Sequence, residues 1–343
     1  LRADNKWLFT KYDVFGRVVY TGIYTHASLQ DQNQMQGNLH TFYTTNTSNN
    51  LCESKQNAEG SYHYYSNQSF PNANMEILTV NYYDDYTFDK AGGNSETSYG
   101  ITPITNVKGL ATGSKVKVLT TNDWITSVTY YDAKSRPIFV YSFNDYLNTT
   151  DIVKNKLDFT GKVEEAKTVH QIIGHNKITT IDIFEYDHTG RLISQKQNIN
   201  NQGEELIAKN HYDELGQLIK KDIGDIESNP LQEVDYTYNI RGWLKELNNP
   251  NWGELGDDLF TFRLGYNDLG TRLYNGNISQ VEWTTSNDEN SRRYNYYYDD
   301  LNRLKNAYFY EWSKNYRFNT YLNYDGNGNI ISLSRGGHIV ENP

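Results

Sequence analysis

A six-residue phrase recurs along the sequence and keeps the same turn-forming chemistry at each recurrence. It opens with an aromatic residue, continues with Asp or Asn, and usually has Gly three positions later. The copies begin at Tyr12, Tyr131, Leu157 (a weaker copy), Tyr186, Tyr212, Tyr238, Tyr266, Tyr298 and Tyr324. From Tyr131 onward the starts are separated by 26, 29, 26, 26, 28, 32 and 26 residues. A period in this range indicates an array of repeated supersecondary units.

The phrase has the chemistry of a β-hairpin tip. Asp and Asn are favoured at the first position of a type I turn, and Gly is favoured at the fourth. The side-chain oxygen accepts hydrogen bonds from backbone N–H groups two residues on, and Gly adopts the left-handed conformation that completes the loop. The sequence therefore predicts structural hairpin tips at Asp13, Gly16, Asp187, Gly190, Asp213, Gly216, Gly242, Gly270, Asp299, Asp325 and Gly328.

The segments beside each phrase have the composition of β-strands. Residues 178–186 and 192–197 flank one tip and contain no Pro, and the first of these segments is rich in β-branched and aromatic side chains. Both faces of such a strand mix apolar and polar residues, which suits a thin curved wall better than a sandwich with one dry face. The aromatic residues expected in this wall are Tyr12, Tyr131, Tyr186, Tyr212, Tyr238, Tyr266, Tyr298 and Tyr324.

The period also predicts how the chain is organised. About 26 residues accommodate two strands and two turns, given a rise of ~3.3 Å per strand residue. An isolated hairpin is marginal in water, so each copy must be stabilised by its neighbours, and we expect an all-β hairpin array forming a curved or spiralling strip. The expected divisions are a first repeat (1–27), an irregular insertion with a strand and a Gly-rich connector (28–111), the regular array (112–335) and the start of a downstream segment (336–343).

Composition limits the classes of partner. Tyr supplies 30 of 343 residues, which suits a wall wetted on at least one side. The formal net charge of −10 comes without a basic stripe, which argues against a nucleic-acid partner. Mean hydropathy is −0.78 and no apolar run approaches the ~20 residues of a membrane span, so no membrane insertion is expected. A single cysteine, Cys52, leaves the redox compartment open.

Taken together, the phrases resemble the YD repeats of the Rhs family of bacterial polymorphic toxins. The hallmark of that family is Tyr-Asp, two variable residues, Gly-Arg and then Leu, and similar runs here are YDHTGRL at Tyr186, YDELGQL at Tyr212 and YDDLNRL at Tyr298. The runs FTKYDVFGR, VNYYDDY, YNIRGWL, YNGNIS and NYDGNGNI are similar to the branch found in outer-membrane bacteria that use type IX secretion. The resemblance covers essentially the whole chain.

The resemblance implies a β-strip that spirals into a hollow shell around a C-terminal toxin domain. In the family a core segment after the repeats plugs the shell and often cleaves itself beside an Asp-Pro signature. This sequence contains no Asp-Pro dipeptide, so neither a toxin nor a self-cleavage site is assigned to any residue. Teneurins share the architecture as adhesion molecules, so the fold leaves cargo and adhesion roles both open.

Two acidic groups are candidates for metal binding or acid–base chemistry. Asp325, Asn327 and Asn329 have the spacing that opens a calcium loop, but Ile330 and Gly336 stand where that loop needs Gly and Glu. A Gly-rich hairpin tip explains the same residues, so no metal site is predicted there.

The densest acidic group is Asp84, Asp85 and Asp89, directly after an apolar strand. A glycosidase needs two carboxylates held ~5–9.5 Å apart, which sequence spacing does not establish. A solvated turn is the favoured interpretation, as it is for Asp257 and Asp258.

Other reactive side chains give no catalytic pattern. His170 and His175 are five residues apart, which would place them on opposite faces of a strand, and no further His or Cys supports zinc. Cys52 has no nearby His, so a nucleophilic role is not indicated. The six Trp residues are compatible with a sugar-stacking surface, although aromatic residues in a β-wall usually pack across strands.

The sequence therefore favours a shell segment that is not an enzyme and uses no cofactor. We expect it to belong to a longer secreted protein, located outside the cell or on its surface, that encloses or presents its own C-terminal toxin or effector domain. An outer-membrane secretion translocon is a candidate partner. The alternative is a cell-surface adhesin or glycan-binding wall, with a surface glycan as partner.

Overall fold

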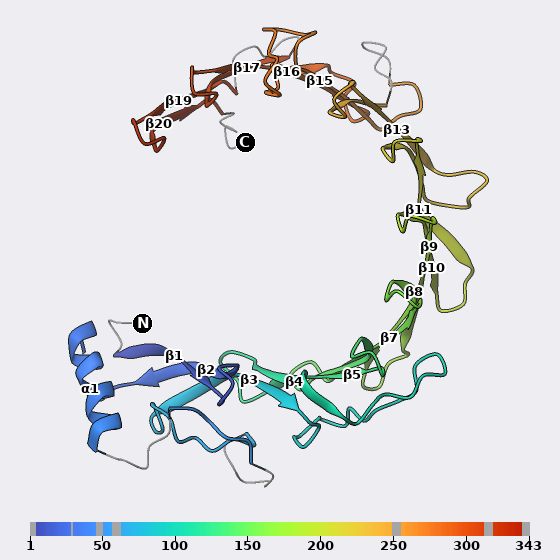
Figure 1. The fold of residues 1–343 in the computed structure, drawn as a ribbon. Helices are drawn as coiled ribbons and strands as arrows, with labels where there is room; N and C mark the ends of the chain where they lie inside the picture. Colours follow the sequence, from blue (N-terminus) through green and yellow to red (C-terminus); the bar gives the residue numbers. More distant parts are fainter. Residues whose placement is uncertain are drawn as a thin grey trace. The chain divides into compact units, whose positions relative to one another are not determined.

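The computed structural model describes residues 5–28, 30–45, 51–56, 63–248, 255–311 and 318–337. These residues contain twenty β-strands and one α-helix (Figure 1). The prediction of an all-β fold is confirmed at this level, with the helix as the exception. No helix in the described ranges is both long and apolar enough to cross a membrane.

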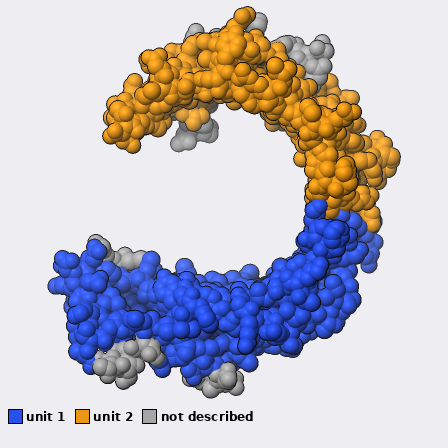
Figure 2. Space-filling model, in the orientation of Figure 1, with its two compact units in different colours: residues 1–184, 197–203 blue, residues 185–196, 204–343 orange. Residues whose placement is uncertain are grey.

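The chain divides into two compact units (Figure 2). The first comprises Leu1–Phe184 and Gln197–Gly203, and the second comprises Glu185–Lys196 and Glu204–Pro343. The boundary runs through one hairpin, so the division does not interrupt the order of the strands along the chain.

The first unit is an antiparallel meander in which each strand pairs with the next. Register pairs connect all successive strands from β1 to β9. Its strands are β1 (Lys6–Tyr12), β2 (Val18–Thr25), β3 (Met75–Asp84), β4 (Val107–Lys117), β5 (Trp124–Tyr131), β6 (Pro137–Asn144), β7 (Thr149–Leu157), β8 (Val163–Ile172) and β9 (Ile178–Tyr186).

The second unit continues in the same manner from β11 to β20. Its strands are β10 (Leu192–Ile199), which the boundary divides, β11 (Glu204–Tyr212), β12 (Leu218–Ile223), β13 (Gln232–Tyr238), β14 (Leu244–Leu247), β15 (Phe260–Gly265), β16 (Gln280–Thr285), β17 (Arg292–Tyr298), β18 (Leu304–Glu311), β19 (Thr320–Tyr324) and β20 (Ile330–Arg335). Among the described residues, no pairing within either unit closes its strands into a barrel.

Most of the recurring phrases connect two paired strands, and each of these carries a register shift at its first residue. The aromatic residue pairs with the residue six positions later, as in Tyr212 with Leu218 and Tyr298 with Leu304. Such a shift is a β-bulge, which absorbs one extra residue and increases the local twist of the strands.

The segment interpreted as an irregular insertion contains the helix, α1 (Gln32–Thr45). Asp31 and Gln34 form a reciprocal capping box, in which each side chain accepts a hydrogen bond from the backbone N–H of the other at 2.8 Å. Met35 is buried, and the Phe42 ring packs edge-on against Phe70 at 5.4 Å. The Gly-rich connector, which was expected to extend to residue 111, ends earlier because strand β4 begins at Val107.

The hydrophobic core of the first unit is formed by residues of β2, β3, β5 and β6 together with Tyr65 and Phe88. Tyr82 from β3 lies stacked between two rings, with centroids 4.1 Å from Phe88 and 6.1 Å from Tyr65. The insertion supplies Tyr65 to this core, so the insertion acts as a second layer over the sheet. The buried members are Val19, Tyr20, Tyr65, Ile77, Val80, Tyr82, Phe88, Val128, Tyr130 and Phe139.

Candidate functional site

The hairpin tips have a common hydrogen-bonding pattern, seen clearly at Asp187. Its carboxylate accepts the backbone N–H groups of Thr189 and Arg191 at 2.9 and 2.8 Å, and the Arg191 Nε at 2.6 Å. The Gly190 N–H donates to the Asp187 carbonyl at 2.9 Å, and Gly190 has φ of +90°. Desolvation raises the pKa of Asp187, but hydrogen bonds from Arg191 and Thr189 outweigh it and hold the pKa below its usual range.

The other acidic tips are arranged in the same way. Asp13 and Asp299 accept an arginine Nε four residues later, while Asp213 and Asp325 accept the backbone N–H of Gln217 and Asn329. The predicted tip glycines with positive φ are Gly16, Gly190, Gly216, Gly242, Gly270 and Gly328. The structure adds Asp132 and Asp158 to the set, each of which accepts backbone N–H groups from its own turn.

Gly270 does not lie in a four-residue tip. Residues 266–279 form a longer loop between β15 and β16, in which the Leu273 N–H donates to the Tyr266 carbonyl and the Ser279 N–H donates to the Gly265 carbonyl. The Asp268 carboxylate accepts a hydrogen bond from the Tyr266 N–H at 3.3 Å within this loop. This correction agrees with the 32-residue spacing that follows Tyr266 in the sequence.

The phrase tyrosines join each hairpin to the one before it. In the second unit the Tyr212 hydroxyl donates to the Leu192 carbonyl at 2.9 Å, and the Tyr238 hydroxyl donates to the Leu218 carbonyl at 2.8 Å. The same bond recurs between residues 20 or 22 positions apart. The further pairs are Tyr131 with Ala111, Tyr266 with Leu244, Tyr298 with Ile278, and Tyr324 with Leu304.

The two remaining predicted wall tyrosines each end a strand. Tyr12 ends β1, is 45% exposed, and accepts the Glu53 N–H at its carbonyl. Tyr186 ends β9 and is half-buried.

The arginine at the sixth position of the phrase reaches forward to the next tip. Arg303 donates to the Asp325 carbonyl at 3.2 Å, and its guanidinium lies 4.6 Å from the centroid of the Tyr324 ring. Arg136 donates to the Asp158 carbonyl at 2.9 Å in the first unit. The planar guanidinium bonds and stacks at the same time, so one side chain fixes two consecutive repeats. Sequence reasoning missed this role, although Arg stands at this position in four of the phrases.

Each of the three carboxylates in the acidic group after β3 forms an ion pair with a different basic side chain. Asp84 pairs with Arg17, Asp85 with Lys55, and Asp89 with Lys115, each at 2.5 Å. The three carboxylates therefore do not converge. Their side chains are between 33% and 59% exposed, in keeping with the expected solvated turn, and each ion pair also connects this segment to another part of the first unit. Asp258, of the second acidic pair, has its pKa raised by desolvation and by the neighbouring Asp235.

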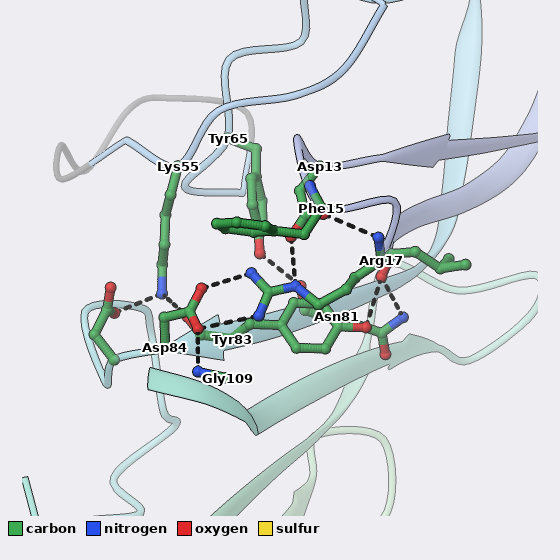
Figure 3. Close-up of polar contacts among 11 residues, drawn as sticks. Asp13, Phe15, Arg17, Lys55, Tyr65, Asn81, Tyr83, Asp84 and Gly109 are labelled. Atoms are coloured by element: carbon green, nitrogen blue, oxygen red, sulfur yellow. Dashed lines mark hydrogen bonds and ion pairs between the residues drawn. The ribbon is translucent and has the colours of Figure 1, made fainter. Parts of the chain in front are cut away.

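Arg17 is the centre of a polar cluster that connects the first tip to β3 and β4 (Figure 3). Two of its nitrogens bind Asp84, a third binds Asp13 at 2.7 Å, and its guanidinium lies 4.3 Å from the centroid of Tyr83. The Gly109 N–H also donates to Asp84 at 2.7 Å. Hydrogen bonding to Arg17 holds the pKa of Asp84 below its usual range. A bidentate ion pair of this kind is rigid and positions elements precisely.

A buried ion pair attaches the insertion to β1. Lys11 Nζ lies 3.0 Å from Glu53 Oε1, and neither side chain is exposed. Ser66, Gln68 and Ser69 donate further hydrogen bonds to the Glu53 carboxylate. Desolvation raises the pKa of Glu53. The hydrogen bonds and the Lys11 charge lower it by more than desolvation raises it, so the pKa of Glu53 lies below its usual value.

The histidine and calcium candidates have structural roles. His170 Nδ1 lies 2.6 Å from Asp151 on the paired strand β7, while His175 lies beyond the end of β8, so the two do not share one strand as the alternation argument assumed. Asp325 accepts the N–H groups of Asn327 and Asn329 within its own tip. Cys52 is half-buried beside Glu53. Within the described ranges, no three His, Cys, Asp or Glu side chains are grouped closely enough to hold a metal ion.

Comparison with known proteins gives no further assignment: no protein-family model matches the chain, and no curated protein matches it significantly.

Proposed function

We propose that this chain is a non-catalytic wall segment of a large secreted Rhs-type bacterial protein, in which a hairpin array encloses or presents a C-terminal toxin or effector domain. The observation that supports this most directly is the repeated bonding of one hairpin to the next. Tyrosine hydroxyls reach back to the preceding repeat, and arginines reach forward to the following tip.

Such bonding suits a wall that grows by addition of equivalent units. Each repeat supplies the acceptor that its successor needs, so stability is the sum of repeat and interface contributions and no new core is required. A wall of this kind isolates a folded domain by steric exclusion and needs no tight contacts with it. Catalysis is assigned to the enclosed domain and not to the wall.

The proposed location is outside the cell or on its surface, after export across the outer membrane. The resemblance of the phrases to the branch that uses type IX secretion supports this route and makes the outer-membrane translocon the proposed transport partner. Full-length protein in the medium of a strain that lacks this system would exclude the route.

Limited proteolysis of the full-length secreted parent, followed by mass spectrometry, tests the wall function. We expect a C-terminal fragment to resist digestion until mild denaturant opens the repeat array, after which both are cleaved. Immediate digestion of everything beyond the repeats would contradict enclosure and favour an exposed adhesin.

A further inference from the structure

A mixed aromatic and charged groove lies in the first unit, away from the hairpin tips. Its volume is about 660 Å³, within the range of small-molecule sites. Strands β3, β4 and β5 supply most of its lining, His63 and Tyr64 come from the segment before β3, and Asp89 comes from the segment between β3 and β4. The lining residues used in the argument are His63, Glu76, Tyr82, Asp89, Lys115, Lys117 and Trp124.

The charged side chains of the groove balance one another. Lys115 Nζ lies 2.5 Å from Asp89, and Lys117 Nζ lies 2.7 Å from Glu76. Because each ammonium group is already neutralised by its carboxylate, the two pairs present no net charge to attract an anionic or cationic ligand. A neutral ligand with hydroxyl groups can still bond both partners, because an ammonium group has three donors and a carboxylate has about four acceptor positions, so each retains unused capacity.

Two aromatic rings, tilted by 59° relative to each other, lie beside these charges. The Trp124 indole and the His63 imidazole lie 5.1 Å apart between centroids. Desolvation, together with the nearby Lys115 charge, lowers the pKa of His63 and favours the neutral ring at pH 7. The groove therefore combines an uncharged aromatic face with paired donors and acceptors.

One lining residue of the groove, Tyr82, carries a polar atom with unmet bonding capacity. Its hydroxyl is buried and has no hydrogen-bond partner among the residues that the structure describes. A buried hydroxyl without a partner is unfavourable, and a ligand hydroxyl within reach would satisfy it.

From this arrangement we propose that the groove binds a neutral saccharide. The apolar face of a pyranose ring packs against Trp124, and its hydroxyls bond the Lys117–Glu76 and Lys115–Asp89 pairs. The site is independent of the proposed wall function, because it uses none of the tip contacts and requires no enclosed domain.

Calorimetric titration of the chain with defined tetrasaccharides tests the site. The neutral probes are cellotetraose, maltotetraose, mannotetraose and chitotetraose, and tetragalacturonate is the acidic probe. We expect at least one neutral probe to bind, and Trp124→Ala to weaken that binding at least tenfold. Trp283→Ala in the second unit is the matched control and should leave binding unchanged.

Two gentler substitutions keep the test valid if Trp124→Ala disturbs folding. Lys117→Met should weaken binding at least fivefold, whereas Lys108→Met, at an exposed lysine of the same strand, should not. Tyr82→Phe should weaken binding without lowering Tm, because it removes only the unpartnered hydroxyl. Absence of binding to every neutral probe, binding of tetragalacturonate alone, or binding unaffected by both Trp124→Ala and Lys117→Met would overturn the proposal.

Discussion

The two units use the same repeat but obtain their stability differently. The first covers its sheet with an insertion and buries a cluster of aromatic and aliphatic residues between the layers. The second has few fully buried apolar side chains and relies on cross-strand ring contacts, such as Trp283 with Tyr294 at 5.9 Å and Tyr294 with Phe309 at 5.1 Å. The second unit indicates that the repeat alone is sufficient for a thin sheet. In the first unit, the insertion adds a second layer over the same kind of sheet.

The largest loss of stability is expected at the buried Lys11–Glu53 ion pair, a feature of the first unit that is not part of the repeat. Glu53→Ala leaves Lys11 buried without its carboxylate partner and should lower the free energy of unfolding by about 3–5 kcal/mol. The measurement is chemical denaturation followed by tryptophan fluorescence. Glu246→Ala, which breaks the partly exposed pair with Arg263 in the second unit, should cost less than half as much. Equal losses would remove the distinction between the units.

A smaller effect is expected at a single tip. Gly190→Val places a β-branched residue at φ of +90° and should cost about 1–3 kcal/mol. Thermal denaturation measures this loss, and Gly326→Val is the control because that tip position has open space and ordinary φ. Asn302→Gly, at a tip where Asn has φ of +61°, should raise stability slightly. Unchanged thermal stability of Gly190→Val would contradict the assignment of the tip.

The tyrosine bonds between repeats should contribute less individually. Tyr212→Phe removes the hydroxyl that reaches Leu192 and should cost about 0.5–1.5 kcal/mol. Hydrogen exchange measured by mass spectrometry should show faster opening of β11 and β12. Tyr297→Phe, at a ring that is 39% exposed, is the matched control. If both variants behave alike, the hydroxyl bond does not connect the repeats.

The smallest expected change in stability comes from the titration of the Asp187 carboxylate with pH. The folded-state pKa of Asp187 lies below its ordinary value near 4, so the carboxylate stabilises the tip at neutral pH. This contribution is lost as the pH falls below about 4 and through the folded-state pKa. Asp187→Asn should therefore be less stable than the parent at pH 7, and the difference should shrink towards pH 2. A difference that does not change with pH would show that the charge of Asp187 has no role.

The repeat itself could be predicted because its signals are local. The tips depend on an acid and a glycine three residues apart, and the strands predicted at residues 178–186 and 192–197 match β9 (Ile178–Tyr186) and most of β10 (Leu192–Ile199). Helix α1 was missed because its sequence is mostly polar and Met35 is its only buried residue. The capping residues Asp31 and Gln34 were a signal that could have revealed it.

The contacts of the first unit could not be predicted from a single sequence. Arg17 and Asp84 are 67 residues apart, and Lys11 and Glu53 are 42 residues apart. Nothing local in the sequence specifies which carboxylate a given cation will meet. The groove around Trp124 has the same limitation, because its lining comes from three strands and the insertion.

The forward contact of the phrase arginine has a consequence for changes in chain length. Arg303 meets the tip that begins 22 residues later, as Arg136 does in the first unit. Deleting one complete repeat therefore brings an arginine opposite an equivalent tip, whereas deleting the same number of residues out of phase does not. Where an arginine stands at the sixth position, a whole repeat can be gained or lost while that junction keeps its chemistry, so the length of the array can change in steps at those junctions.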